Sequence, residues 1–169
     1  VITVNGVSKG FAMTGWRLGY IGAPKWIADA CTKIQGQFTS APCSIAQAAA
    51  ATAVEADPSI AHSMVAAFLR RRNAMHASLS KVPGINLNLP MGAFYLFPDV
   101  SKLFGKSFNG TTLNNSDDVA MFLIEEAHVA TVSGAAFGTP ECIRISYAAA
   151  DEVLEEAVRR IEAAVSKLV

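Results

Sequence analysis

Lys9 and Arg17 could together hold a cofactor that carries both a carbonyl and a phosphate group. Lys9 is followed by Gly10, and Arg17 lies eight residues further on, bracketed by Gly15 and Gly19. A neutral lysine amine can attack a carbonyl carbon and form an imine, and an arginine presents a planar fork of N–H donors that matches phosphate oxygens. Spacing alone is weak evidence, because most lysines beside glycines are solvated loop residues.

Arg144 is a third cation with unusual neighbours. It lies between Ile143 and Ile145, within an apolar run that is typical of a strand. A buried charge is costly unless a partner compensates it. The residues alone allow a structural salt bridge as one explanation for this arginine.

The composition indicates a folded chain with no electrostatic preference for nucleic acid or membrane surfaces. Of the 169 residues, 51% are hydrophobic and 17% are charged, which suits a buried core and favours one domain or slightly more. The formal net charge is zero, so neither a nucleic acid nor a membrane is expected as a partner. No apolar run approaches the roughly 18 residues that span a bilayer, and the first residues do not resemble a secretory signal.

The cysteines and histidines are scattered, which argues against a metal site and against a disulfide framework. Metal ligands normally recur at short spacings, and disulfide frameworks use an even number of cysteines. Reduced thiols in a cytoplasmic protein are therefore the simplest interpretation. The residues concerned are Cys31, Cys43, Cys142, His62, His76 and His128.

The segment that contains Lys9 and Arg17 is predicted to form two strands, and two helices are predicted after it. β-branched residues favour a strand over residues 1–8, and residues 17–23 suggest a second strand whose glycines allow close backbone approach. Pro24 suits the first position of a helix, and the alanine-rich stretch 44–56 is interpreted as an ordinary buried helix. The expected apolar face of the first helix comprises Trp26, Ile27, Ala30, Cys31 and Ile34.

Asp57 and Pro58 mark the start of a long helix, because aspartate is a favourable N-cap and proline suits the first helical position. The helix should run to about residue 82 and includes the basic run 70–72. This run is interpreted as a solvated face and not as a nucleic-acid-binding patch, because the net charge is neutral.

The remaining residues alternate between short strands and helices, which indicates an α/β chain. Ser116 is predicted to cap a helix whose first turn carries acidic residues. The predicted strands are 85–89, 93–97, 129–132 and 142–147, the predicted helices are 116–127 and a terminal one from Asp151, and a polar surface loop is expected over 99–115.

The string from Asn5 to Tyr20 reads Asn-Gly-x-x-Lys-x-Phe-Ala-Met-Thr-Gly-Trp-Arg-x-Gly-Tyr. It resembles the cofactor-lysine motif of the class I and II aminotransferases, which are fold-type I pyridoxal-phosphate enzymes, and in particular their prokaryotic aspartate aminotransferase branch. Two downstream strings are similar to the same family: Pro-x-Gly-Ala-Phe-Tyr, which contains Phe94, and Arg-Ile-Ser-Tyr, which begins at Arg144. The resemblance covers nearly the whole chain.

The resemblance implies the C-terminal part of a fold-type I transferase, an α/β fold. Residues 1–57 would be the end of the large cofactor-binding domain, and residues 58–169 an α/β small domain that the long helix enters. The chain is accordingly expected to belong to a longer protein that works as a homodimer. We expect it to be inactive by itself, since other parts of the cofactor site would lie upstream of Lys9.

The resemblance also implies roles for individual residues. The cofactor would be pyridoxal 5′-phosphate, and the substrates an α-amino acid, aspartate or a similar one, and a 2-oxo acid. Lys9 would bind the cofactor and act as general acid and base, Arg17 would bind its phosphate, and Arg144 would bind the substrate α-carboxylate. Phe94 would line the substrate site, with a role as a core aromatic as an equal alternative.

Two other functions remain open. The same motifs serve C–S lyases and related β-eliminases, which release ammonia. An aminotransferase-like fold also occurs as the effector domain of transcription regulators, downstream of a DNA-binding domain. Products formed by the full-length protein would separate the first alternative, and a winged-helix segment upstream would indicate the second.

Overall fold

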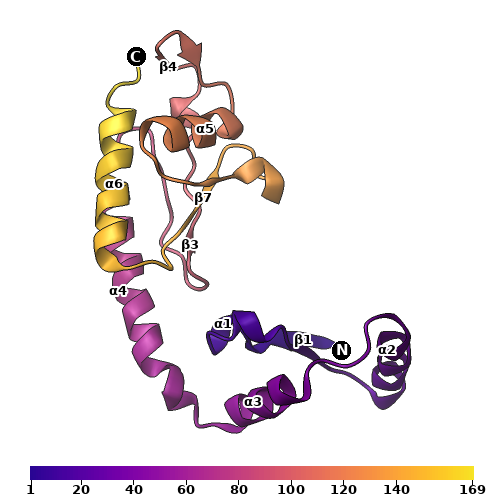
Figure 1. The fold of residues 1–169 in the computed structure, drawn as a ribbon. Helices are drawn as coiled ribbons and strands as arrows, with labels where there is room; N and C mark the ends of the chain where they lie inside the picture. Colours follow the sequence, from indigo (N-terminus) through magenta and orange to yellow (C-terminus); the bar gives the residue numbers. More distant parts are fainter. The chain divides into compact units, whose positions relative to one another are not determined.

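The structure, a computed structural model, describes all 169 residues, which divide into two compact units, Val1–Ser63 and Met64–Val169. Figure 1 shows the elements of both units. The division falls near the start of the long helix α4 (His62–Leu79). The preceding elements are β1 (Thr3–Gly6), α1 (Val7–Gly10), the 3-10 turn η1 (Thr14–Trp16), β2 (Gly19–Gly22), α2 (Lys25–Phe38), α3 (Ser44–Glu55) and the 3-10 turn η2 (Pro58–Ala61).

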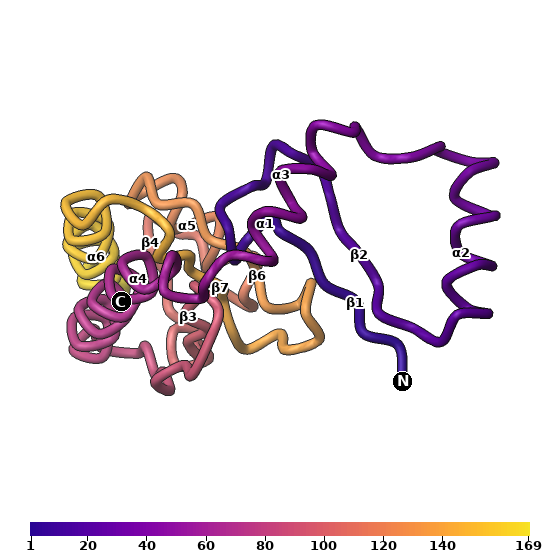
Figure 2. Tube along the Cα trace, turned by 90° about the horizontal axis from the view of Figure 1, so that it is seen from below, coloured from indigo at the N-terminus to yellow at the C-terminus, as the bar shows by residue number.

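In the first unit, β1 and β2 pair as an antiparallel ribbon, and Figure 2 traces both strands and the chain that connects them. The strand predicted over residues 1–8 is wrong at its end, because the backbone turns into α1 directly after Gly6. At that point the Asn5 side chain accepts a hydrogen bond from the Gly6 N–H at 2.8 Å, and the following Val7 is fully buried. Lys9 therefore lies on a helical turn.

Few side chains of the first unit are buried: Val7 of α1, and Ala46 and Ala50 of α3. Helix α3 is therefore not the buried helix that its alanine content predicted, since only two of its residues are buried. Helix α2 forms in the predicted region, but its apolar face is open, with Trp26 74% and Ile34 60% exposed. Helical periodicity identified these elements correctly, yet this unit supplies no packing partner for their apolar sides.

The second unit packs helices against a small antiparallel sheet, in agreement with the predicted α/β class. The strand order is β3–β7–β6. The elements of this unit after α4 are β3 (Tyr95–Leu96), the 3-10 turn η3 (Ser101–Leu103), β4 (Ser107–Phe108), β5 (Thr111–Thr112), α5 (Ser116–Glu126), β6 (Val132–Ser133), the 3-10 turn η4 (Gly134–Phe137), β7 (Ile143–Ser146) and α6 (Asp151–Val165).

The two faces of this sheet have different surroundings. Successive side chains of a strand point to opposite faces, and in β7 Ile143 and Ile145 are buried whereas Arg144 and Ser146 are less so. The buried face joins the hydrophobic core of the unit, which α4, α5 and α6 complete (Figure 1). The core includes Met75, Leu79, Leu96, Val119, Phe122, Leu123, Ile143, Ile145, Leu154, Val158, Ile161 and Val165.

One of the two predicted helix caps is confirmed and the other is wrong. The Asp57 carboxylate accepts a hydrogen bond from the Ser59 N–H at 2.8 Å, although the segment begins as the η2 turn and α4 ends at Leu79. Helix α5 is capped by Asn115 and not by Ser116, because the side-chain amide oxygen of Asn115 accepts hydrogen bonds from the N–H groups of Asp117 and Asp118 in the first turn. Ser116 is 1% exposed, so its hydroxyl faces the interior.

The basic run of α4 is only partly the solvated face that we predicted, because Arg70 is exposed whereas Arg71 and Arg72 are partly covered and all three have hydrogen-bond partners. Arg70 and Arg71 donate hydrogen bonds to the carboxylate of Asp151, at 2.5 and 3.2 Å, and Arg72 donates to the carbonyl of Pro90 at 3.0 Å. The hydrogen bond from Arg70, supported by that from Arg71, lowers the pKa of the Asp151 carboxyl. The run therefore connects α4 to the start of α6 and to the turn that precedes β3.

Two predictions for the segment between α4 and α5 are corrected. The predicted strand 85–89 is reduced to a single bridge between Asn86 and Asp99. The polar segment that follows is not simply a surface loop, because it contains η3 and the β4–β5 hairpin. Leu103 and Leu113 are both buried in the core and anchor this segment.

Candidate active site

Lys9 is carried by α1, a single helical turn between the paired strands β1 and β2. The pairing of Gly6 with Gly19 closes the segment at its base. The buried side chain of Val7 anchors the turn where α1 packs against α3, whereas Lys9 is exposed. The local fold thus places the Lys9 amine at the surface of the first unit.

Two glycines allow β1 and β2 to approach closely at this point. A Cβ atom on Gly6 would lie 3.3 Å from the carbonyl oxygen of Leu18, and one on Gly19 would lie 3.2 Å from that of Asn5. Both distances are tighter than ordinary contacts, so a larger residue would push the strands apart. Backbone spacing thus explains Gly6 and Gly19 of the sequence string, but not Gly15, where a Cβ atom would meet nothing within 4 Å.

Arg17 follows η1 in the left-handed backbone region, with φ 52° and ψ 52°. This conformation is uncommon for a residue other than glycine, and such outliers concentrate at functional positions. The guanidinium donates a hydrogen bond from Nη1 to the carbonyl of Thr14 at 2.9 Å and is otherwise exposed. This bond orients the side chain and leaves its other N–H groups for a ligand.

The donor set of this segment fits a phosphorylated carbonyl cofactor. An amine and a guanidinium lie on one short stretch between β1 and β2, and both are exposed. Arg17 forms no ion pair with a carboxylate in the structure. An amine that binds a carbonyl carbon and a fork that binds an oxyanion are the two functions that such a cofactor requires.

Arg144 lies on the sheet face opposite the helices, where two aromatic rings contact it. Its Cζ atom is 4.5 Å from the ring centroid of Tyr95 and 4.5 Å from that of Phe137. The structure thus surrounds this half-buried guanidinium with aromatic rings and not with a carboxylate. The salt bridge that the sequence allowed is absent.

Phe94 lies at the border between the hydrophobic core and the sheet. Its ring centroid is 6.0 Å from that of Phe68 and 4.4 Å from that of Tyr95. The turn before it is held by Tyr147, which donates a hydrogen bond to the carbonyl of Ala93 at 3.0 Å. Phe94 is half-buried, so its packing against the core leaves part of the ring uncovered.

The turn η4 positions Phe137 beside Arg144. Ser133 caps this turn by accepting a hydrogen bond from the Ala135 N–H at 3.2 Å, and its hydroxyl lies 2.8 Å from that of the buried Ser116. A polar contact between β6 and α5 thus fixes the start of the turn whose last residue is Phe137.

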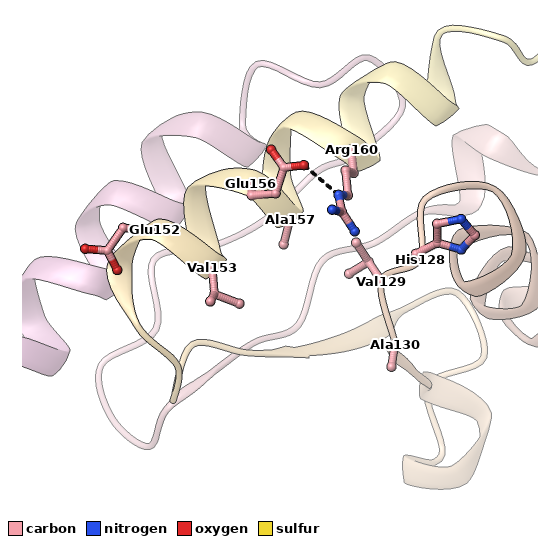
Figure 3. A pocket seen from close by; sticks show the side chains of 8 residues that line it. All are labelled: His128, Val129, Ala130, Glu152, Val153, Glu156, Ala157 and Arg160. Carbon is pink, nitrogen blue, oxygen red and sulfur yellow. Dashed lines mark hydrogen bonds and ion pairs between the residues drawn. The ribbon is translucent and has the colours of Figure 1, made fainter.

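A separate hollow of about 450 Å³ lies over α6 and the α5–β6 connection and contains none of the predicted site residues (Figure 3). Glu156 and Arg160 form an ion pair beside it, with Nε 2.7 Å from the carboxylate. Hydrogen bonds from Arg159 and Arg160 lower the pKa of Glu156 to about 2, so this carboxyl cannot donate a proton at neutral pH. The lining residues are His128, Val129, Ala130, Glu152, Val153, Glu156, Ala157 and Arg160.

The structure shows no cluster of three or more His, Cys, Asp or Glu residues that could hold a metal ion. None of its helices has the combination of length and apolar character that crossing a membrane requires.

Tyr95 and Phe137 are the residues near Arg144 that sequence reasoning missed. Alternation along residues 93–97 places Tyr95 on the face opposite Leu96, which could have indicated a contact with the strand that carries Arg144. Phe137 gave no such signal, because a residue in a turn has no predictable facing direction. The two rings reach the Arg144 guanidinium only because β3 and β6 both pair with β7.

Comparison with known proteins gives consistent similarities along the chain. Residues 1–161 match the family model described as Aminotransferase class I and II. A bifunctional aspartate aminotransferase and glutamate/aspartate-prephenate aminotransferase from Petunia hybrida is 47% identical over 167 residues, covering 96% of this chain and 35% of that protein. An aspartate/prephenate aminotransferase from Cereibacter sphaeroides is 46% identical, with 96% of this chain and 41% of that protein covered.

Solved structures extend the similarity to the fold. The crystal structure of an aspartate aminotransferase from Rhizobium meliloti superposes with a TM-score of 0.95 at 41% identity, covering 99% of this chain and 42% of that one. This likeness confirms the predicted α/β fold of the fold-type I transferases. The chain spans less than half the length of each of these three proteins.

Proposed function

Because this chain belongs to the class I and II aminotransferase family, we propose that the full-length protein transfers an amino group from an α-amino acid to a 2-oxo acid. The observation that carries the proposal is the exposed Lys9 amine on a segment that also presents Arg17. Aspartate is the donor that we propose, since the similar proteins from Petunia hybrida and Cereibacter sphaeroides both have aspartate in their names.

The residues of the first unit would hold pyridoxal 5′-phosphate. When bound, this cofactor supplies an aldehyde that accepts the amino group and a ring that withdraws electrons from the substrate Cα. Lys9 would bind the aldehyde carbon through Nζ and, once released, would accept and return the proton at the substrate Cα as general base and acid. Arg17 would bind the phosphate through N–H groups that its bond to Thr14 does not use.

The residues of the second unit would bind the substrate. The Arg144 guanidinium forms no ion pair in the protein, so its N–H groups could bind both oxygens of the α-carboxylate. The uncovered part of the Phe94 ring would form an apolar side of the substrate site. Both residues would orient the amino acid. Holding a substrate in the reactive orientation lowers the entropic part of the reaction barrier.

The assembly and the cellular location are further parts of the proposal. We propose that the full-length protein is a homodimer, which sedimentation of the purified protein would test. A cytoplasmic location is supported by Cys31, Cys43 and Cys142, which are unpaired in the structure, because thiols stay reduced in that compartment.

The test is amino transfer by the full-length protein with aspartate as donor and 2-oxoglutarate or prephenate as acceptor. We expect oxaloacetate to form in equal amount with the aminated acceptor, and Lys9→Ala to abolish the reaction. Lys25→Ala is the matched control, because Lys25 is an exposed lysine of the same unit that pairs with Asp29 at 2.6 Å. Release of ammonia in place of amino transfer would indicate a lyase, and full activity of Lys9→Ala would contradict the proposal.

A further inference from the structure

We propose that Tyr95 and Phe137 form an aromatic clamp that positions the Arg144 guanidinium for the substrate α-carboxylate. This inference rests on the proposed function, since it concerns the same substrate-binding arginine. It assigns a role to two residues to which the proposed function gives none. The two residues are positioning residues, because they would act on the substrate only through Arg144.

The register of the sheet places Tyr95 and Arg144 on one face. Tyr95 lies opposite Ser146, which is two residues from Arg144 in β7, so both side chains leave the sheet on the side away from the core. Diagonal neighbours of this kind are within reach of long and aromatic side chains. The observed distance of 4.5 Å between the Arg144 Cζ and the Tyr95 ring centroid agrees with this geometry.

Phe137 reaches the same cation from η4. The strand before this turn, β6, pairs with β7 so that Val132 lies opposite Arg144, and the chain then returns through η4 to bring the Phe137 ring within 4.5 Å of Cζ. The ring is held in turn by Phe97, whose centroid is 6.1 Å away in an edge-to-face arrangement. The clamp thus consists of one ring on β3 and one on η4, and Phe97, directly after β3, supports the second ring.

A pair of rings is suited to holding this guanidinium for a ligand. Aromatic faces attract a cation within about 6 Å of the ring centroid without accepting its in-plane N–H groups. A protein carboxylate would orient the arginine equally well, but it would occupy the donors that a substrate carboxylate needs. The structure shows no hydrogen bond and no ion pair from the Arg144 side chain, so its donors remain available.

The first measurement is the steady-state kinetics of the full-length enzyme with aspartate. Tyr95→Leu and Phe137→Leu should each raise the KM for aspartate by about three- to tenfold, the order expected for loss of one cation–π contact, with kcat changed by less than about twofold. Tyr95→Phe and Phe137→Tyr keep the rings and should restore the KM. Phe108→Leu is the matched control, since that ring contacts Lys167 at 5.5 Å and has no contact with Arg144.

A double-mutant cycle separates positioning from general disruption. In an Arg144→Met background, the leucine substitutions should cause no further rise in KM, because residues in one network are not additive. If the leucine substitutions raised the KM equally in the Arg144→Met background, or if Phe108→Leu raised the KM to a similar extent, the clamp would be overturned. A fall in kcat with an unchanged KM in Tyr95→Leu or Phe137→Leu would also overturn it.

A readout without turnover keeps the clamp distinguishable from the proposed function. Ring currents from Tyr95 and Phe137 should displace the Nε–H resonance of Arg144 in the NMR spectrum of the full-length protein, and each leucine substitution should move it back toward that of a solvated arginine. A resonance that neither substitution changes would overturn the clamp. Absence of amino transfer by the wild type with an intact ring-current shift would overturn the proposed function instead.

Discussion

Gly134→Ala should destabilise the second unit strongly, because η4 begins where no side chain fits. A Cβ atom on Gly134 would overlap the carbonyl oxygens of Thr139 and Cys142. Two backbone hydrogen bonds connect Gly134 to the same two residues. The Gly134 N–H donates to the Cys142 carbonyl at 2.7 Å, and the Thr139 N–H donates to the Gly134 carbonyl at 3.0 Å. The added methyl group cannot be accommodated without moving the backbone that these bonds hold.

The magnitude follows from these contacts. Each backbone hydrogen bond contributes about 1 kcal/mol to stability, and overpacking by a methyl group costs roughly 1–3 kcal/mol. Loss of both bonds together with the steric cost gives about 3–5 kcal/mol of destabilisation. Because about 1.4 kcal/mol corresponds to a factor of ten, backbone amides that exchange through opening of this unit should exchange roughly 10²- to 4 × 10³-fold faster.

The assay is hydrogen–deuterium exchange of the β7 and α6 amides in the full-length protein, followed by mass spectrometry. Gly92→Ala is the matched control, since a Cβ atom there meets no atom within 4 Å, and it should change stability by less than about 0.5 kcal/mol. Equal exchange rates in the two variants would refute the reasoning, because they would show that the turn relaxes freely around an added side chain.

Two further predictions concern α5 and α6. Asn115→Ala should destabilise α5 by about 1 kcal/mol through loss of its N-cap, whereas Asn115→Ser should retain it; amide exchange of the first turn of α5 measures both, and equal exchange would contradict the assigned cap. Glu156 has its pKa lowered from 4.5 to about 2 by Arg159 and Arg160, so its stabilising contribution is present above pH 4.5 and is lost as the pH falls toward about 2. Protection of α6 in Glu156→Gln should therefore vary less over this range than in the wild type, and identical pH profiles would exclude the pairing.

The sequence identified most elements, because helical periodicity and strand propensity are local properties. It was less successful where a tertiary contact decides the outcome. The interior position of Ser116, for example, depends on a hydroxyl of β6, and the cap therefore moves to Asn115. Arg70 and Arg71 were likewise predicted as solvated residues of a helix, and their common partner Asp151 could not be identified from local sequence because it lies 80 or more residues away.

The apolar face of α2 shows a different limit. The spacing of Trp26 and Ile34 predicted a packing face, and the helix forms, but the described chain leaves that face exposed. Hydrophobic periodicity shows which face of a helix is suited to burial, but it does not identify the surface that covers this face. The chain spans less than half the length of the relatives it matches, so the prediction concerned the correct residues, and the surface that would cover them is not among the residues described.

Arg144 shows which part of a site the sequence can indicate and which part it cannot. Its position between two isoleucines indicated a charge that would need compensation if it were removed from water, and this indication comes from the strand alone. The nature of the compensation depends on the register of β3 and β6 against β7, which brings Tyr95 and Phe137 to the guanidinium. Because rings compensate the charge without using its N–H groups, the same arrangement that makes the arginine tolerable in the sheet also leaves those groups available for the carboxylate that we propose as its ligand.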